Sequence, residues 1–324
     1  MTSPPQFVPI LRNPKAGARR RRHELLELVR ELKARGLIPR LFRHRRRLAA
    51  WMTDDARRAR VRCLVAAGGD GTVNELLTRF PGVPLTVLPL GTENLLAKSL
   101  QIPLSGRAVA EIVADGAVLH LDVGRIGQSR FLMCAGIGLD AAVIRAVHQS
   151  RKGHIHKLNY LWPTLRLLFS YPSHELVLTD ESGVEHRGRQ ILIFNLPRYA
   201  LGLQMAPEAL GNDGWLDVRL FAGNMRHWTV RYLWRAWRGT LNQEPSVTAL
   251  RIRRANISSA QAVPIHVDGD PAGFTPVDVE VLPLALTLLV PATSVGGSTV
   301  VEFGSLLRQS DAPDWECAPP TARV

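Results

Sequence analysis

Three segments of this sequence share one pattern, an apolar strand that runs through glycine into a helix. The clearest is Ala66-Ala67-Gly68-Gly69-Asp70-Gly71-Thr72-Val73-Asn74-Glu75, which continues the apolar run 63–67. Glycines let a ligand approach the main chain, and a helix N-terminus offers free N–H groups and the positive end of its dipole. The pattern indicates phosphate binding, with Asp70 able to bind a metal or accept a proton. A tight turn with Asp70 as a helix cap stays open as the alternative.

The other two turns follow strands at either side of this segment. Asn13-Pro14-Lys15-Ala16-Gly17 follows strand 7–11, and Pro89-Leu90-Gly91-Thr92-Glu93-Asn94 follows strand 84–88. The carboxyl ends of parallel strands meet at one edge of a sheet, where open α/β sheets bind ligands. The alternation of strands and helices therefore predicts a doubly wound parallel α/β domain over residues 1–125.

The pattern changes after residue 118, where short strands follow one another and many alternate polar with apolar residues. Such a pattern is typical of an antiparallel sheet, so we expect a β-rich, sandwich-like domain over residues 126–284. Residues 305–324 are rich in proline and are expected to form a disordered tail. The expected strands are 118–123, 130–135, 174–179, 190–195, 215–221, 250–255, 263–267 and 277–282, with helices at 140–149 and 223–241.

The formal net charge of +13 is concentrated near the start of the chain. Residues 1–60 hold 17 Lys and Arg against 5 Asp and Glu. Such a field attracts a nucleotide, a nucleic acid or an anionic membrane surface, unless it is only a solvated helix face. We expect no nucleic-acid partner, because the basic residues are not interleaved with stacking aromatic residues.

The sequence points to a reducing compartment. The N-terminal segment lacks the apolar core of a signal peptide, and no window reaches 18 uninterrupted apolar residues. The three cysteines, Cys63, Cys134 and Cys317, fit no metal-ligand spacing. We therefore expect a cytoplasmic protein without a membrane span.

Two turns in the second half carry clustered oxygen ligands. In the loop 206–217, the carbonyls of Leu210 and Trp215 and the Asp213 carboxylate suit a hard cation, although a turn held by Asp side chains explains them too. Asp268 and Asp270 flank a glycine at a strand end. Paired carboxylates can hold Mg²⁺ and accept a hydroxyl proton, although an Asp-Gly hairpin turn has the same pattern.

The segment 225–241 is amphipathic. Val230, Trp234, Trp237 and Leu241 share one helical face, and Arg231, Arg235 and Arg238 share the neighbouring one. A Trp/Arg helix suits an anionic membrane interface, and a helix packed on the sheet is the alternative.

Together with Gly136-Ile137-Gly138-Leu139-Asp140-Ala141, these motifs resemble, in their order, the signature of the diacylglycerol kinase catalytic-domain family. That family includes bacterial lipid kinases and the sphingosine and ceramide kinases. The resemblance covers roughly residues 7–292. It implies an ATP cleft between the two domains and a last strand, around 286–290, that returns to the first domain, so that residues 285–304 join residues 1–125.

The resemblance also assigns roles to residues. Asp270 would accept the hydroxyl proton. Asp268 would orient Asp270 or share the metal, and Asp70 would help hold catalytic Mg²⁺. Leu210, Asp213 and Trp215 match the loop that holds a structural Mg²⁺. The residues expected to contact nucleotide and phosphates are Asn13, Pro14, Lys15, Gly17, Gly68, Gly69, Asp70, Gly71, Thr72, Asn74, Gly91, Thr92 and Asn94.

Two residues depart from the family pattern. Asp270 stands where bacterial members have Glu, and it is one methylene shorter. Leu95 stands where many members have Asp, which removes a carboxylate beside the metal or the lipid head group.

The resemblance implies a lipid kinase that transfers the γ-phosphoryl of ATP, with Mg²⁺, to a hydroxyl of diacylglycerol or a sphingoid-type lipid. Such an enzyme of phospholipid metabolism would sit peripherally on the anionic inner face of the membrane. A NAD kinase-like small-molecule kinase and a non-catalytic nucleotide or lipid sensor stay open, as does assembly into a homodimer. The residues expected to line the lipid groove are Leu158, Tyr160, Leu161, Trp162, Leu165, Leu168 and Phe169.

Overall fold

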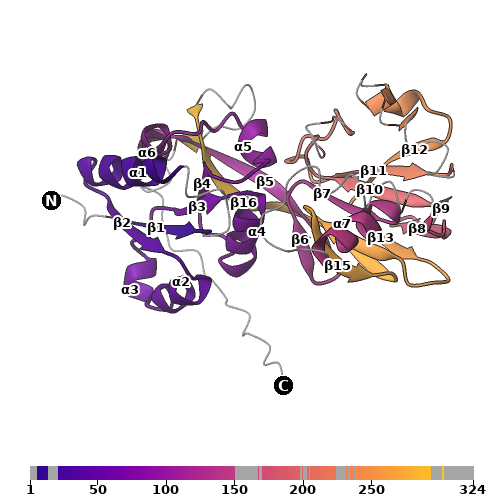
Figure 1. Ribbon diagram of the computed structural model, residues 1–324, viewed down its shortest axis with the longest axis horizontal. Coiled ribbons are helices and arrows are strands. Elements are labelled where there is room, and N and C mark those ends of the chain that lie inside the picture. Colours follow the sequence, from indigo (N-terminus) through magenta and orange to yellow (C-terminus); the bar gives the residue numbers. More distant parts are fainter. Residues whose placement is uncertain are drawn as a thin grey trace.

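The structure is a computed structural model in which the chain forms two sheets. Figure 1 shows a region of mixed helices and strands beside a region made mostly of strands. The structure describes residues 6–13, 21–149, 167, 170–197, 199, 203, 205–223, 231–232, 234–236, 238, 240–292 and 301–302.

The N-terminal region is built on four parallel strands in the order β2-β1-β3-β4. Every residue of β3 and β4 is buried, as expected for strands covered on both faces. Figure 1 shows α1 and α6 on one face of this sheet and α2 and α3 on the other, which confirms the predicted α/β fold. The elements are β1 (Phe7–Arg12), α1 (Arg22–Ala34), β2 (Ile38–Phe42), α2 (Arg45–Met52), α3 (Asp55–Arg58), β3 (Leu64–Gly68), α4 (Asp70–Arg79), β4 (Leu85–Pro89), α5 (Leu95–Ser99) and α6 (Gly106–Asp115).

The C-terminal region is an antiparallel sandwich, which confirms the second part of the fold prediction. One layer has the strand order β12-β11-β10-β7-β14-β15, and the facing layer contains β13, β8 and β9 with parts of β5, β6 and β16. Alternate residues of both layers form a common apolar core. The elements are β5 (Ala117–Ile126), β6 (Ser129–Phe131), β7 (Cys134–Ile137), α7 (Leu139–Gln149), β8 (Leu176–Asp180), β9 (Glu185–Gly188), β10 (Gln190–Phe194), β11 (Leu216–Phe221), a 3-10 turn η3 (Leu241–Gln243), β12 (Val247–Ile252), β13 (Arg254–Ser258), β14 (Pro264–Val267), β15 (Asp270–Phe274), β16 (Val277–Val290) and β17 (Val301–Glu302).

Strands β5 and β16 connect the two regions as one antiparallel ribbon. The first part of β16 pairs with β13 of the sandwich, and Leu288 near its end pairs with Leu85 of β4. The register with β5 shifts between Leu282 and Leu286, where the chain bulges. The last strand therefore returns to the N-terminal sheet, as the resemblance implied.

Several predicted elements differ in their limits. The predicted strands 130–135 and 250–255 are each two strands, and β9 and β15 were not predicted. The residues proposed for the lipid groove and the tail 305–324 lie outside the described residues, and the expected domain boundaries stay predictions.

No helix within the described parts of the chain is long and apolar enough to span a membrane.

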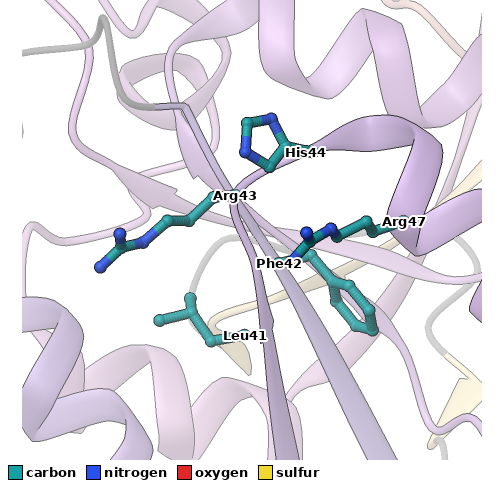
Figure 2. Close-up of a pocket in the computed structure, with 5 residues that line it drawn as sticks. All are labelled: Leu41, Phe42, Arg43, His44 and Arg47. Atoms are coloured by element: carbon teal, nitrogen blue, oxygen red, sulfur yellow. The ribbon is translucent and has the colours of Figure 1, made fainter.

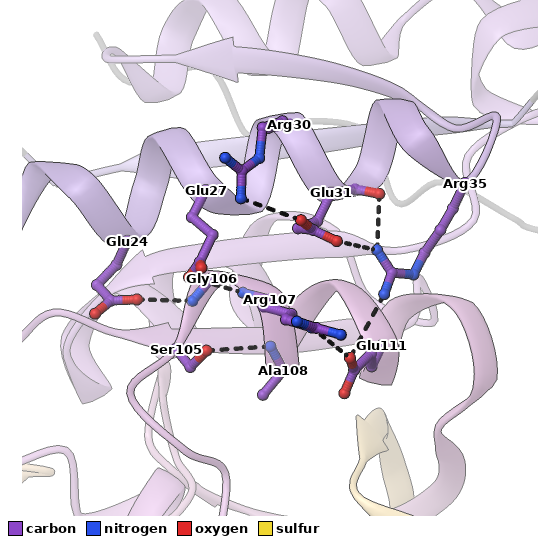
Figure 3. Close-up of polar contacts among 10 residues, drawn as sticks. All are labelled: Glu24, Glu27, Arg30, Glu31, Arg35, Ser105, Gly106, Arg107, Ala108 and Glu111. Carbon is purple, nitrogen blue, oxygen red and sulfur yellow. Dashed lines mark hydrogen bonds and ion pairs between the residues drawn. The ribbon is translucent and has the colours of Figure 1, made fainter.

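Helices α1 and α6 approach each other closely because α6 begins with a glycine. A methyl group built on Gly106 would lie 2.1 Å from the carbonyl oxygen of Glu24 and 2.5 Å from the nitrogen of Leu28. Figure 3 shows Glu24 and Glu27 of α1 reaching the start of α6, where they accept the N–H groups of Gly106 at 2.8 Å and Arg107 at 3.1 Å. Carboxylates at this end also favour the helix dipole.

We expect Gly106→Ala to destabilise the protein by about 1–3 kcal/mol, because its methyl group meets backbone atoms that cannot move without separating the two helices. Urea unfolding of the variant measures this loss. Arg107→Ala, on the exposed side of the same turn, is the control and should change stability by about 0.5 kcal/mol or less. Equal stability of the two variants would contradict the close contact.

Candidate functional site

Two of the glycine turns meet at one edge of the parallel sheet, beside Asn13, which follows β1. Leu90 and Gly91 donate their N–H groups to the carbonyl of Gly68 at 3.0 and 3.1 Å. A methyl group built on Gly91 would lie 2.5 Å from the Cα of Gly69, so only glycine allows this contact between the β3–α4 and β4–α5 turns. Asn13 joins them, since its N–H donates to Ala67 at 3.1 Å.

The first of the three turns is described only at Asn13, whose amide lies 3.5 Å from the Thr72 hydroxyl. Pro14, Lys15 and Gly17 lie outside the described residues. Their predicted contacts with nucleotide stay predictions.

Asp70 stands where α4 begins, yet its side chain caps a different helix. Its two carboxylate oxygens accept the N–H groups of Leu95 at 3.0 Å and Leu96 at 3.1 Å, at the start of α5. Burial raises the pKa of Asp70, although these hydrogen bonds and Lys98 oppose the increase. Position 95 thus contributes its backbone N–H to this contact, and a leucine supplies that N–H as well as an aspartate does.

Asn94 leaves an acceptor open between the glycine turns. Its side-chain N–H groups donate to the carbonyls of Pro89 at 3.0 Å and Gly91 at 2.9 Å, which fixes the orientation of the amide. The amide oxygen is buried and has no hydrogen-bond partner among the described residues. A ligand that donates a hydrogen bond there would satisfy it.

The other two predicted contact residues of this edge differ in their surroundings. Thr92 is exposed at the turn after β4. Asn74 instead donates to the carbonyl of Arg130 at 3.0 Å and so joins α4 to β6 of the C-terminal region.

Asp268 accepts hydrogen bonds from the backbone where β6 passes into β7. One of its oxygens accepts the N–H of Leu132 at 2.8 Å, and the other accepts those of Met133 at 2.9 Å and Cys134 at 3.0 Å. Burial is the main cause that raises the pKa of Asp268 to about 6, and the neighbouring carboxylate of Asp70 raises it further against the three hydrogen bonds. The structure thus brings the two predicted acidic residues into one electrostatic site.

Asp270 lies next to the start of α4. A methyl group built on Gly71 would lie 3.8 Å from one oxygen of this carboxylate. The other oxygen lies 3.4 Å from Nε2 of His148, in the last turn of α7, and the same nitrogen lies 3.2 Å from the carbonyl oxygen of Gly269. The Asp270 side chain is 60% exposed and can therefore meet a substrate hydroxyl.

A further, half-buried carboxylate lies near this turn. Asp140 contacts Nε2 of His266 at 2.6 Å and accepts the hydroxyl of Tyr199 at 2.5 Å. Burial alone would raise the pKa of Asp140, but the charge and hydrogen bond of His266 together with the Tyr199 hydroxyl lower it. This pair fixes the start of α7 on β14 and so positions the strand that directly precedes Asp268.

A basic pocket lies at the carboxyl end of β2, beside β1. Figure 2 shows Leu41 and Arg43 on one side of the strand and Phe42 and Arg47 on the other, with His44 near the start of α2. The pocket places positive charge at the edge of the sheet where the parallel strands end.

The site residues fit ATP with Mg²⁺. Gly69 and Gly91 bring the backbones of the two turns together at the sheet edge, Asn94 offers an open acceptor, and the Asp70 carboxylate is near enough to raise the pKa of Asp268. No group of three or more His, Cys, Asp and Glu in the described part of the chain could hold a metal by itself. Mg²⁺ can bind through one or two carboxylates together with substrate phosphates, and Asp70 and Asp268 are the carboxylates that would serve.

The loop expected to hold a structural Mg²⁺ does not fit a cation. One oxygen of Asp213 accepts the N–H of Trp215 at 3.2 Å, and the other pairs with the guanidinium of Arg251. The Leu210 side chain is 63% exposed. The guanidinium of Arg251 thus brings a positive charge to the Asp213 carboxylate, and this charge disfavours a second cation at the same oxygen.

The described part of the Trp/Arg segment packs partly against the rest of the chain, which is one of the two alternatives left open by the sequence. Arg231 and Arg235 both pair with the buried Glu244, at 2.8 and 2.7 Å, and Leu241 is buried. Trp234 is 52% exposed, with the guanidinium of Arg238 4.8 Å from its ring centre. Val230 and Trp237 lie outside the described residues.

Sequence reasoning assigned no role to His148, His266 or Arg251. A signal for His266 exists, since polar residues at 266, 268 and 270 alternate with apolar residues at 265 and 267 and so share one face of the strand. No local pattern indicates His148 or Arg251, because their partners lie far away in the sequence.

We expect the raised pKa of Asp268 to make stability depend on pH. The folded state binds this proton more tightly than the unfolded state does, so the contribution is fully present below about pH 4 and is lost as the pH rises through about 6. Urea unfolding of the wild type and Asp268→Asn between these pH values measures it. The free energy of unfolding should fall with rising pH in the wild type relative to the variant, and a constant difference would contradict the assignment.

Two family models match the chain, one on each region. Residues 8–126 match the diacylglycerol kinase catalytic domain, and residues 134–290 match the YegS C-terminal NAD kinase beta sandwich-like domain. A solved structure, a putative diacylglycerol kinase from Bacillus anthracis str. Sterne, superposes with a TM-score of 0.70 at 20% identity, covering 91% of this chain and 100% of that one. This likeness concerns the fold.

Two relatives align with most of this chain. A probable lipid kinase YegS of Salmonella paratyphi A is 28% identical over 250 residues, 74% of this chain and 81% of the relative. An uncharacterized protein of Synechocystis sp. is 24% identical over 236 residues, 70% of this chain, which spans 54% of that relative's length. The motifs, the fold and the two matched models together show that this chain belongs to the diacylglycerol kinase catalytic-domain family, with a YegS-type C-terminal domain.

Proposed function

We propose that this protein transfers the γ-phosphoryl group of ATP to a hydroxyl of a membrane lipid. The observation that carries the proposal is the position of Asp270 beside Gly71, where the Asp-Gly-Asp turn of one region meets the glycine turn of the other. A proton acceptor then lies next to the helix start that suits phosphate.

The phosphate end of the nucleotide is expected at the sheet edge formed by Gly68, Gly69 and Gly91. The N-terminus of α4 and the basic residues near β2 would attract its negative charge. Mg²⁺, when bound with the phosphates, would neutralise charge that develops during transfer, and Asp70 and Asp268 are the residues that would hold it.

Asp270 would accept the proton of the lipid hydroxyl. The hydroxyl oxygen forms the new bond to the γ-phosphorus while the bond to the β–γ bridging oxygen breaks, and ADP leaves. His148 and the backbone of residue 269 keep the carboxylate at the start of α4. Positioning of this kind supplies much of the rate of phosphoryl transfer.

A lipid acceptor requires contact with a membrane surface. The exposed Trp234 with Arg238, and the basic N-terminal region, suit an anionic surface on which the protein would bind peripherally. Diacylglycerol, sphingoid bases, ceramide and phosphatidylglycerol all offer a primary hydroxyl.

The test is an assay with radiolabelled ATP and Mg²⁺ against these lipids in mixed micelles, with NAD as a separate acceptor. We expect label in one lipid, and Asp270→Ala should lower kcat by about 10²–10⁴-fold, the range for loss of a general base. Asp278→Ala removes an exposed carboxylate of β16 and is the matched control. Label in NAD alone would support the small-molecule kinase instead, and ATP binding without label anywhere would support a sensor.

We expect His148→Ala to lower kcat by about 10–100-fold without changing the Kd for ATP, because the Asp270 carboxylate loses its anchor while the glycine turns stay intact. His148→Gln keeps an N–H donor on a side chain of similar reach and should restore part of the rate. Equal kcat in the wild type and His148→Ala would contradict this role. A changed Kd for ATP in both variants would instead indicate general damage to the site.

A further inference from the structure

We propose that the guanidinium of Arg251 is the resident cation of the loop 210–215, so that this loop closes without a metal ion. The proposal does not depend on the kinase activity. It replaces the structural Mg²⁺ that the sequence led us to expect at Leu210, Asp213 and Trp215.

Both oxygens of the Asp213 carboxylate have partners within the chain itself. One oxygen accepts the N–H of Trp215, two residues further on, and the other pairs with Nη2 of Arg251. Arg251 also lies over the Trp215 ring, 5.3 Å from its centre. The guanidinium thus combines a charge-assisted hydrogen bond with an aromatic contact, which suits arginine better than any other cation.

The same arginine faces a second carboxylate. Asp217 is 2% exposed, and its Oδ1 atom has no hydrogen-bond partner within the described residues. The nearest charge to that oxygen is Nε of Arg251, at 3.7 Å. Burial raises the pKa of Asp217 and so does Glu208, while Arg251 and Arg219 lower it. Arg251 therefore offsets two acidic side chains at once.

Strand pairing fixes Arg251 in this place. In the antiparallel ladder of β11 and β12, Asp217 and Arg251 are direct partners. Directly opposed residues have neighbouring side chains, and opposite charges there are favourable. The ladder thus holds the backbone of Arg251 opposite Asp217, so that the guanidinium starts beside both carboxylates.

The shape of the loop has its own internal support. Asp122 is fully buried and accepts the N–H of Gly214 at 2.7 Å, while its backbone N–H donates to the carbonyl of Gly211 at 2.7 Å. A bound cation commonly orders a loop by collecting its oxygens. Here hydrogen bonds to one buried aspartate and the charge of Arg251 share that task.

The first test uses the wild-type protein alone. We expect its Tm to be the same in EDTA and in millimolar Mg²⁺ or Ca²⁺. We also expect any tryptophan-sensitised emission of added Tb³⁺ to be the same in the wild type and in Asp213→Asn. A Tm that rises with cation in the wild type, and not in Asp213→Asn, would overturn the proposal without any variant at Arg251.

The second test removes the guanidinium. We expect Arg251→Met to lower Tm in EDTA and to gain about 5–10 °C at a cation concentration of about 100 times Kd, because the freed carboxylates then accept a divalent cation. Tb³⁺ emission should appear in this variant and disappear again in Arg251→Met with Asp213→Asn.

Arg253→Met is the matched control. Arg253 lies between β12 and β13, and its guanidinium is 4.3 Å from the centre of the same Trp215 ring. Within the described residues, Asp213 pairs with Arg251 and not with Arg253. We expect a lowered Tm that does not respond to cation. An equal cation response of the two methionine variants, or no response of Arg251→Met, would overturn the claim that Arg251 stands in place of a metal.

Discussion

The buried carboxylate of Asp122 joins three segments that lie far apart in the sequence. It belongs to β5, and its two oxygens accept the N–H groups of Gly214 in the loop before β11 and of Leu284 in the bulge of β16, each at 2.7 Å. Without this bulge, β16 could not pair with the sandwich at one end and with β4 at the other. The position of the sandwich relative to the parallel sheet therefore depends on a charge-assisted interaction inside the connecting ribbon.

That position decides the chemistry, because neither region has a complete site. The parallel sheet supplies the glycine turns and Asp70, and the sandwich supplies Asp268 and Asp270. Burial raises the pKa of both Asp70 and Asp268, and the Asp70 carboxylate raises that of Asp268 further, yet each is held by backbone N–H groups that favour the charge. Burial and charge repulsion disfavour the charged carboxylates, while the backbone hydrogen bonds favour them. Carboxylates balanced in this way respond to a cation or a proton, which suits a phosphoryl-transfer site.

The sequence predicted features that local periodicity encodes and missed those that depend on distant partners. Strand, glycine turn and helix are local, so the sheet edge and its residues were found. The predicted strand 130–135 breaks because Leu132, Met133 and Cys134 give their N–H groups to Asp268 instead of to a neighbouring strand. The role of Asp122 could not be predicted for the same reason. The partners of this buried aspartate lie far away in the sequence, and its role depends on them.

The shorter acid at position 270 illustrates how this chain accommodates a departure from its family. A carboxylate with one methylene less reaches less far, so its usefulness depends on how closely the backbone brings it to the reaction. Gly71 has no side chain and lets the carboxylate approach the start of α4, and the His148 imidazole stands against its other oxygen. The reach lost in one side chain is thus compensated by contacts on both sides of the acid, from two helices that belong to different regions of the protein.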